Sequence, residues 1–251
     1  MRSDLSTHPS LNPGATPYVD PWYRFARVIE LVERHVPNIS NATWLDLGSE
    51  VGQFLKLVQR KHRIQPTGID NFDRSNVVEV CHKYFGLDID DPDEVLDSSW
   101  RYVSRSLDKT GIALNEQFDF ISALEILEHM TDTDAFLRDC RGHLRDGGHL
   151  VLSTPNINSL RNRIQVPLGI YPAGLEYRNI IHHVRLYNVP TLEEHLREHG
   201  FEVVAISGVN FLPARLLSYR FFRRIDAVLA DRLPRLCGTI MVLSRRKPEQ
   251  V

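Results

Sequence analysis

The sequence has few cysteines, no long apolar run and no large excess of charge. Only three cysteines occur among 251 residues, and the wide, odd spacing of Cys81, Cys140 and Cys237 excludes a disulfide framework and a CxxC metal site. Cysteines used in this way favour a reducing compartment. No apolar run reaches about 18 residues, so we expect no membrane-spanning helix, and the first residues lack the apolar stretch of a signal peptide. We therefore expect a cytoplasmic protein, with contact to a membrane surface left open.

Composition and charge exclude further classes of protein. Hydrophobic residues make up 42% of the chain and charged residues 25%, which excludes a disordered or collagen-like chain. A net charge of −2 argues against a nucleic-acid partner. The charge is uneven, however: residues 1–150 carry 16 basic and 24 acidic side chains, whereas residues 151–251 carry 14 and 8. We expect an anionic partner to meet the second part.

The order of patterns predicts one α/β domain over residues 21–251, preceded by a flexible tail at residues 1–20. Short apolar segments typical of strands alternate with amphipathic segments typical of helices, which predicts a mostly parallel sheet. Helices are expected at 22–36, around 54–58, and near 134–144 and 192–199. Strands are expected at Thr43–Leu47, Thr67–Asp70, Phe118–Leu124, His149–Thr154, Phe201–Ser207 and Thr239–Ser244, with a turn at Asp146–Gly148.

Three further segments bear on partners. Residues 71–101 are acidic and irregular. Residues 155–190 are expected to form a long irregular insertion, rich in proline, that carries Arg161, Arg163 and Arg178 among apolar residues. The insertion follows a strand, so it is expected to form a lid or acceptor wall. Residues 211–233 are expected to form a basic amphipathic helix, with Leu217, Phe221, Ile225, Val228 and Leu229 in one stripe. Such a helix can lie on an anionic membrane, or its stripe can belong to the core.

The segment WLDLGSEVGQFL, from Trp44 to Leu55, joins a strand to a helix through a glycine-containing turn. The strand carries Asp46 near its end, and Gly48 and Gly52 bracket the turn, where a missing Cβ lets a ligand approach the backbone. Asp70 ends the next strand, and its carboxylate could accept both hydroxyls of a ribose. A plain strand-to-helix turn and a helix N-cap are the alternative interpretations.

A third segment, FDFISALEILEHMTDTDAFLRDCRGHLRDGGHLVLSTPN at residues 118–156, completes a pattern. The combination of D-x-G-x-x-x-G, a strand-end acid, FD…LEH and DGG-x-L-x-x-S-T-P-N resembles class I S-adenosylmethionine-dependent methyltransferases. The resemblance covers about residues 40–207 and is strongest to the branch with ubiquinone-biosynthesis, natural-product and glycan O-methyltransferases. It implies a Rossmann-like, doubly wound, seven-stranded sheet with an antiparallel last strand, so we place a third strand near Tyr102–Ser106.

The resemblance also implies a set of cofactor-binding residues. The loop would hold the methionine part of S-adenosylmethionine, Asp70 the ribose, and Asp108 with Leu107 the adenine. Leu124 and Glu125 would lie where the end of their strand passes the sulfonium. Glu50 stands where the family usually has a third glycine. The full cofactor set is Asp46, Gly48, Ser49, Gly52, Asp70, Asn71, Leu107, Asp108 and Leu124.

A second constellation is expected to act on the acceptor. ALEILEHM places Glu125, Glu128 and His129 at i, i+3 and i+4, on one face if a helix starts there. His182 and His183 follow the insertion. The pattern looks like the E-x-x-E-H plus downstream His of metal-assisted O-methyltransferases, which implies Mg²⁺, Mn²⁺, Fe²⁺ or Zn²⁺ on Glu125, Glu128, His129 and His183.

Alternatives to the metal remain open at this point. His129 or His183 could be a general base without any ion, and Glu128 could cap the following helix. His183 matches the family's H-x-R pattern better than His182. Arg185 of that pattern would pair with an acid or an anionic substrate group, or form a structural salt bridge.

The leading hypothesis is O-methylation of a hydroxyl on a small molecule, glycan or lipid-linked intermediate. N- or C-methylation without a metal is a second hypothesis. A third is a non-catalytic subunit in which Glu50 blocks the cofactor. A nicotinamide dehydrogenase is weaker, because the loop lacks G-x-G-x-x-G.

Overall fold

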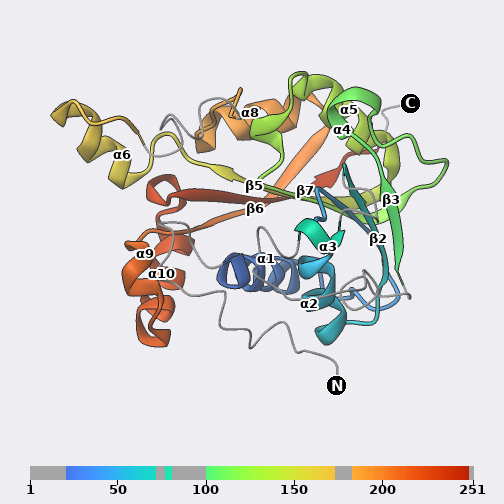
Figure 1. Cartoon of the computed structure of the whole chain (residues 1–251), viewed down its shortest axis with the longest axis horizontal. Helices are drawn as coiled ribbons and strands as arrows, with labels where there is room; N and C mark the ends of the chain where they lie inside the picture. The colour runs from blue at the N-terminus through green and yellow to red at the C-terminus, as the bar shows by residue number, and fades with distance from the viewer. Residues whose placement is uncertain (1–20, 72–76, 81–99, 173–182, 249–251) are drawn as a thin grey trace.

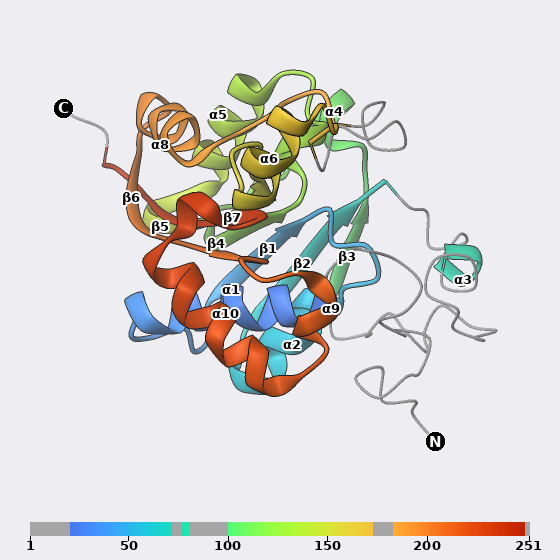
Figure 2. The same ribbon diagram turned by 90° about the vertical axis from the view of Figure 1, so that its left-hand side faces the viewer.

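The computed structural model describes residues 21–71, 77–80, 100–172 and 183–248. In these residues, one seven-stranded sheet lies between two layers of helices (Figures 1 and 2). The strand order is β3-β2-β1-β4-β5-β7-β6. The strands are β1 (Thr43–Leu47), β2 (Gln65–Asp70), β3 (Arg101–Ser104), β4 (Phe118–Leu124), β5 (Leu144–Pro155), β6 (Phe201–Val209) and β7 (Thr239–Arg246).

Helices connect most of the strands. The longer ones are α1 (Pro21–His35), α2 (Gln53–Lys61), α5 (Thr133–His143), α8 (Val189–Glu198) and α10 (Arg220–Arg232). Shorter ones are α3 (Val77–Val80), α4 (Leu107–Thr110), α6 (Leu160–Gln165) and α9 (Ala214–Leu217), with 3₁₀ turns η5 (Leu127–His129), η6 (Val166–Leu168) and η7 (Pro234–Leu236).

The sheet reverses its winding between β1 and β4. β1 pairs in parallel with β2 on one side and with β4 on the other. In open α/β sheets, ligands bind beyond the carboxyl ends of the strands at such a switch point. β7 is antiparallel to both β5 and β6, so the expected doubly wound sheet with an antiparallel last strand is confirmed.

Two apolar cores, one on each face, hold the sheet between its helices. On one face Trp44 of β1 stacks on Phe120 of β4 at 4.5 Å between ring centroids, and both pack with Phe54 of α2. The opposite core includes Leu137 of α5 and Leu192 of α8. Strands buried on both faces are apolar along most of their length, which explains why β1 and β4 stand out in the sequence.

The expected strands are present, with small shifts at their ends. β1 and β4 have the expected bounds, and the strand placed near Tyr102–Ser106 is Arg101–Ser104. β5 begins at Leu144, five residues earlier than expected. The turn at Asp146–Gly148 therefore lies within β5, beside a register shift in its pairing with β4, and Gly147 has φ +75° there.

Two expectations about the second part of the chain were wrong. The helix expected at 211–233 is broken into α9 and α10, because Tyr219 between them has an extended backbone with φ −100° and ψ 129°. Its apolar stripe is also divided: Leu217 is buried, whereas Phe221 is 66% exposed. The insertion at 155–190 is not wholly irregular, since it contains α6 and η6.

Several expectations lie outside the described residues. These are the tail at residues 1–20, Cys81, Arg178, His182 and most of the acidic stretch at 71–101. Cys140 and Cys237 are buried free thiols. Among the described helices, none combines the length and the apolar character needed to cross a membrane.

The turn between β1 and α2 needs glycine at both of its ends. Gly48 and Gly52 have φ values of +70° and +76°, which side chains disfavour. A Cβ at Gly48 would lie 2.0 Å from the side chain of Ile126, and one at Gly52 would lie 1.5 Å from Trp100. The turn is therefore fixed by backbone conformation and by close neighbours together.

A pair of glycine substitutions separates these two effects. Gly147→Ala places a side chain on a backbone with φ +75°, and nothing lies within 4 Å of the new Cβ. It should therefore lower the unfolding free energy by about 1 kcal/mol through backbone strain alone. Gly52→Ala adds overpacking against Trp100, which should cost a further ~1–3 kcal/mol. Urea denaturation of both variants measures the difference, and equal losses would contradict the packing argument.

Candidate functional site

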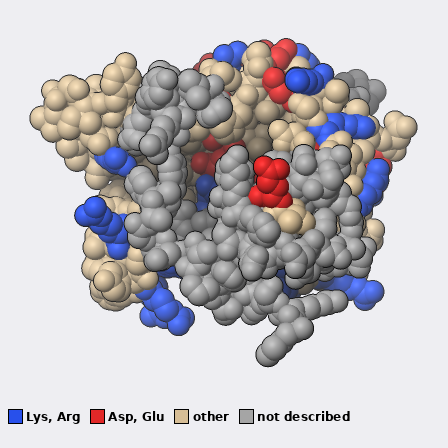
Figure 3. Space-filling view, in the orientation of Figure 1, with Lys and Arg blue, Asp and Glu red and all other residues tan. Residues whose placement is uncertain are grey.

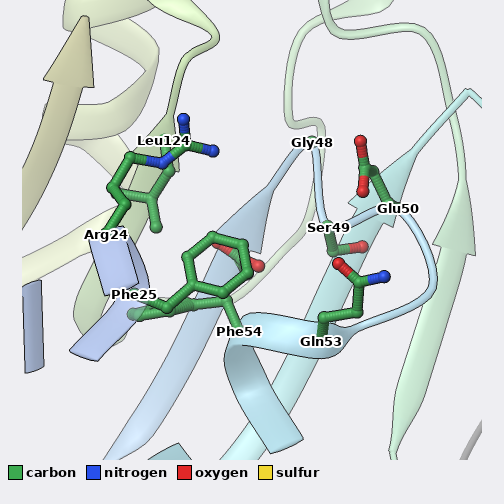
Figure 4. Close-up of a pocket in the computed structure, with 9 residues that line it drawn as sticks. Arg24, Phe25, Gly48, Ser49, Glu50, Gln53, Phe54 and Leu124 are labelled. Atoms are coloured by element: carbon green, nitrogen blue, oxygen red, sulfur yellow. The ribbon is translucent and has the colours of Figure 1, made fainter. Parts of the chain in front are cut away.

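A cavity of about 170 Å³ opens beyond the carboxyl ends of β1 and β4. The turn after β1 forms one side of it, and α1 and the end of β4 form the other (Figure 4). Figure 4 shows the rings of Phe25 and Phe54 beside each other in the cavity, with Arg24 above them. The lining residues are Arg24, Phe25, Asp46, Gly48, Ser49, Glu50, Gln53, Phe54 and Leu124.

Asp46 is a buried carboxyl group that lines this cavity. It is 3% exposed, and the Ser122 hydroxyl donates to its Oδ1 at 2.5 Å. Burial, together with the nearby carboxylates of Asp70 and Glu50, raises the pKa of Asp46 to about 8, although the hydrogen bond from Ser122 acts to lower it. A cationic ligand in the cavity would favour the ionised form of this group.

Asp70 holds the turn from the next strand. Its Oδ2 accepts from the backbone N–H of Glu50 at 2.7 Å, and its Oδ1 accepts from the N–H of Asn71 at 2.7 Å. The N–H groups of Gly48 and Ser49 both donate to the carbonyl of Ile69. The strand-end acid therefore shapes the turn; its contact with a ribose, and that of the exposed Asn71, remain predictions.

Glu50 occupies the middle of the turn with a left-handed backbone, φ 47°. Its side chain is exposed, and Figure 4 shows its carboxylate directed away from Phe25 and Phe54. Desolvation by neighbouring groups and the Asp70 carboxylate raise the pKa of Glu50, while Arg24 lowers it. The side chain stands at the rim of the cavity and leaves its interior open.

The chain turns sharply at Glu125, directly after β4. Glu125 has φ 59°, and its N–H donates to the carbonyl of Ser153 at 2.9 Å. Its carboxylate accepts from the Ser153 hydroxyl at 2.8 Å and lies 3.6 Å from the guanidinium of Arg24. The helical face expected for Glu125, Glu128 and His129 was wrong, because only Leu127–His129 is helical.

Glu128, His129 and His183 do come together. One ligand atom from each lies within 4.8 Å of the others, and the two imidazole rings are 5.0 Å apart. Glu128 is 2% exposed, and its Oε2 accepts from the Thr154 hydroxyl at 3.0 Å. Its Oε1 is buried and has no hydrogen-bond partner among the described residues. Burial and the Glu125 carboxylate raise the pKa of Glu128 to about 8.

The backbone of Glu128 also positions the segment that carries His183. Its carbonyl accepts from the N–H groups of Val184 at 2.9 Å and Arg185 at 3.2 Å. The guanidinium of Arg185 donates to the carbonyl of Thr131 at 2.7 Å, so this side chain bonds to backbone. Asp132 caps α5 through the N–H of Ala135, a role that the sequence left open for Glu128.

The residues expected at the adenine lie at the start of α4. Asp108 accepts from the N–H of Thr131 at 2.8 Å and from its hydroxyl at 3.1 Å. Leu107 is half-buried and packs against the core. These bonds link α4 to the segment after η5, and contact with a cofactor remains a prediction.

Four lining residues were missed by sequence reasoning. Arg24 and Phe25 come from α1, and Gln53 and Phe54 come from the start of α2. The sequence pattern marked Phe25 and Phe54 as apolar positions of amphipathic helices, but it did not indicate that they line a cavity. No pattern in the sequence shows that Arg24 reaches across to Glu125.

The burial of Asp46 predicts a pH-dependent stability. The folded carboxyl group stays protonated up to about pH 8, whereas the unfolded group ionises near its ordinary pKa of 3.8. Folding therefore takes up a proton across this window, and the unfolding free energy should fall as the pH rises. Urea denaturation from pH 5 to pH 8 should show this fall reduced in Asp46→Asn.

Asp119 provides the control for this experiment. Its partners hold its pKa below the ordinary value, so it is ionised in both states between pH 5 and pH 8. Asp119→Asn should therefore shift the curve without changing its slope. Equal slopes for the wild type and Asp46→Asn would show that Asp46 is ionised when folded.

Comparisons with known proteins agree with this geometry. A family model described as a methyltransferase domain matches residues 22–206. The chain is 29% identical over 146 residues to the mitochondrial ubiquinone biosynthesis O-methyltransferase of Homo sapiens, covering 58% of this chain and 38% of that protein. It is 28% identical over 110 residues to the ubiquinone biosynthesis O-methyltransferase of Marinobacter nauticus, covering 44% of this chain and 46% of that protein. The chain thus spans less than half the length of these two relatives.

A solved structure shows the same fold at low sequence identity. An S-adenosylmethionine-dependent methyltransferase from Mesorhizobium loti matches with a TM-score of 0.57 and 18% identity, covering 89% of this chain and all of that one. The family match includes the glycine turn, Asp70 and the LEH segment. The chain therefore belongs to the methyltransferase-domain family, and its resemblance to class I S-adenosylmethionine-dependent methyltransferases is confirmed.

Proposed function

We propose that the protein transfers a methyl group from S-adenosylmethionine to a hydroxyl group of a small-molecule acceptor. One observation supports this above the others: β4 and the residues that follow it contribute to both the cavity and the Glu128 cluster. Leu124 ends β4 and lines the cavity, and Glu128 follows four residues later in the cluster with the two histidines. A methyl donor at the first site would therefore adjoin acid–base groups at the second.

The cavity has features suited to the cofactor. The sulfonium of S-adenosylmethionine carries a transferable methyl group, and its methionine part carries an amine. Asp46 supplies a carboxyl group that lines the cavity, and Phe25 and Phe54 supply apolar walls. Glu125 lies next to the cavity, 3.6 Å from the lining residue Arg24. Under this proposal Asp70 and Asn71 face the ribose, and Leu107 and Asp108 the adenine.

Glu128, His129 and His183 fit a divalent metal ion. One carboxylate and two imidazoles form a mixed oxygen and nitrogen donor set, and the buried, unpartnered Oε1 of Glu128 is a free ligand atom. A bound ion would lower the pKa of an acceptor hydroxyl. Glu125 lies with Ser153 and Arg24, so we now propose it as a neighbour of the sulfonium and not as a ligand.

The same histidines can act on the acceptor proton directly. An O-methylation requires the hydroxyl proton to leave as the oxygen attacks, and an imidazole near neutral pH can accept it. His183 is our first choice, since its segment is fixed by two hydrogen bonds to the Glu128 carbonyl. His129 is the second choice, next to it in the cluster.

An exposed apolar surface on the insertion after β5 supports an apolar or lipid-linked acceptor. Five apolar side chains on and after α6 are 49–69% exposed: Ile164, Val166, Leu168, Ile170 and Tyr171. In Figure 3 this projection is mostly uncharged, and Lys and Arg side chains lie below it, on the side of α9 and α10. Apolar side chains beside arginines suit an anionic membrane surface, where a lipid-linked acceptor would be found. The free thiols of Cys140 and Cys237 support a cytoplasmic location.

Cofactor binding is the first test. Calorimetric titration of the EDTA-treated protein with S-adenosylhomocysteine should show binding at about micromolar strength, roughly −8 kcal/mol. Glu50→Gly should bind with similar affinity, because the Glu50 side chain points away from the cavity. Binding that appears only in Glu50→Gly would support a non-catalytic subunit.

The acceptor-side cluster is tested by turnover with a hydroxyl acceptor. His183→Ala should lower turnover at least ~10-fold through loss of a base or ligand, while its affinity for S-adenosylhomocysteine stays unchanged. The control is His35→Ala, a histidine on α1 outside the cluster. Unchanged turnover in His183→Ala would remove this residue from the catalytic set.

Metal add-back separates the two roles of the cluster. If an ion is used, EDTA should abolish turnover and Mn²⁺, Mg²⁺, Fe²⁺ or Zn²⁺ should restore it, whereas Glu128→Gln should respond weakly. Turnover that survives chelation would favour His183 as a metal-free base, or N- or C-methylation.

A further inference from the structure

A second cluster of metal-ligating side chains lies outside this site, between α5 and α8. These helices neighbour each other on one face of the sheet (Figures 1 and 2). Asp134 is on α5, His195 is on α8, and His199 is the residue that directly follows the end of α8. One ligand atom from each residue lies within 4.8 Å of the others.

His199 makes one contact with each of its ring nitrogens. Its Nδ1 lies 2.9 Å from the carbonyl oxygen of His195, and because a carbonyl only accepts, Nδ1 carries a proton. A neutral ring then directs the lone pair of Nε2 toward Oδ1 of Asp134, at 3.6 Å. Two acceptors face each other, an arrangement that a proton or a metal ion between them would stabilise.

The contacts of His195 also leave one ring nitrogen directed at Asp134. Its Nε2 lies 2.8 Å from Oδ1 of Asp134, and its Nδ1 lies 3.1 Å from the hydroxyl of Tyr187. A hydroxyl can donate or accept. With the imidazole proton on Nδ1 and the Tyr187 oxygen accepting it, Nε2 is free to bind a metal, and metal-bound histidines usually have such an outer partner.

We propose that Asp134, His195 and His199 bind a divalent transition-metal ion, with Zn²⁺ as the preferred ion. Two imidazoles and a carboxylate favour Zn²⁺ over Mg²⁺ or Ca²⁺, which prefer all-oxygen sites. Ligand atoms around tetrahedral Zn²⁺ are about 3.3 Å apart, between the 2.8 Å and 3.6 Å of the two Asp134 contacts. The Asp134 side chain is 58% exposed, so water can supply a fourth ligand.

The ion would tie α8 to α5 and fix the segment before α8. Tyr187 stacks on His195 at 5.9 Å between ring centroids, and its carbonyl accepts from the N–H of Ile157. His183 lies only four residues before Tyr187. The ion would thus be structural, anchoring the far end of the segment that carries His183.

Zinc stoichiometry tests the proposal. Full-length, untagged protein is treated with EDTA and titrated with Zn²⁺ by calorimetry, for the wild type, His199→Gln, His183→Gln and the double variant. His199→Gln should remove one equivalent of bound Zn²⁺ from both the wild type and the His183→Gln background. His35→Gln is the matched control, since its Nδ1 also contacts a carbonyl four residues earlier, and it should remove none.

A second measurement guards against misfolding. Co²⁺ bound to His183→Gln should give visible absorption bands, and these should disappear when Asp134→Asn is added, with circular dichroism unchanged. The proposal is overturned if His199→Gln and Asp134→Asn bind as much metal as their parents, which would leave a protonated His199 paired with Asp134. Because the result is a difference within each background, it stands whether or not the Glu128 cluster binds a metal.

Discussion

The parallel pairing of β1 with β4 is the constraint on which both parts of the methyltransferase site depend. This pairing places the turn after β1 beside the turn after β4 at the edge where the sheet reverses direction. Ile126 lies against Gly48, so the two turns touch, and a side chain at Gly48 would separate them. The cavity and the Glu128 cluster are neighbours because their strands are.

Acidic groups crowd this edge of the sheet, and their environment favours cations. Asp46 and Glu128 are both buried, and burial raises the pKa of each to about 8. Arg24 lies near Glu125, at 3.6 Å, and lowers the pKa of Glu50. Ionising the buried carboxyl groups therefore becomes easier when a positive ligand binds: an amine and a sulfonium in the cavity, or a metal ion at Glu128.

The sequence predicted the fold well where local pattern and tertiary burial agree. β1 and β4 are apolar on both faces, and their bounds were predicted to the residue. The prediction of one helix over 211–233 failed because the amphipathic spacing continues through Ser218 and Tyr219, whereas the extended backbone of Tyr219 separates α9 from α10. The prediction of a shared helical face for Glu125 and Glu128 failed likewise, since Glu125, directly after β4, has a left-handed backbone that its residue type does not signal.

The site residues also divide into those that a local motif predicted and those that only tertiary packing brings into place. The motifs predicted Glu128, His129 and His183. The first and last of these are 55 residues apart in the sequence and still meet in the structure. A family motif can predict such a long-range contact, because it reflects a shared fold. Arg24 and the Asp108–Thr131 bonds carry no motif and arise only when helices and loops pack. Contacts of this kind depend on where elements end, which is where sequence patterns are weakest.

Glu128 joins structure and chemistry in a way that makes its two roles separable. Its carbonyl fixes Val184 and Arg185, and so holds His183 near the cluster, whereas its carboxyl group contacts Thr154 and supplies the unpartnered Oε1. Substitution by glutamine keeps the backbone bonds and the side-chain shape but removes the ability to ionise when a cation binds. In this variant His183 should keep its position while cation binding weakens. The backbone of Glu128 therefore determines how the acceptor-side residues are arranged, and the buried carboxylate of Glu128 determines how they react.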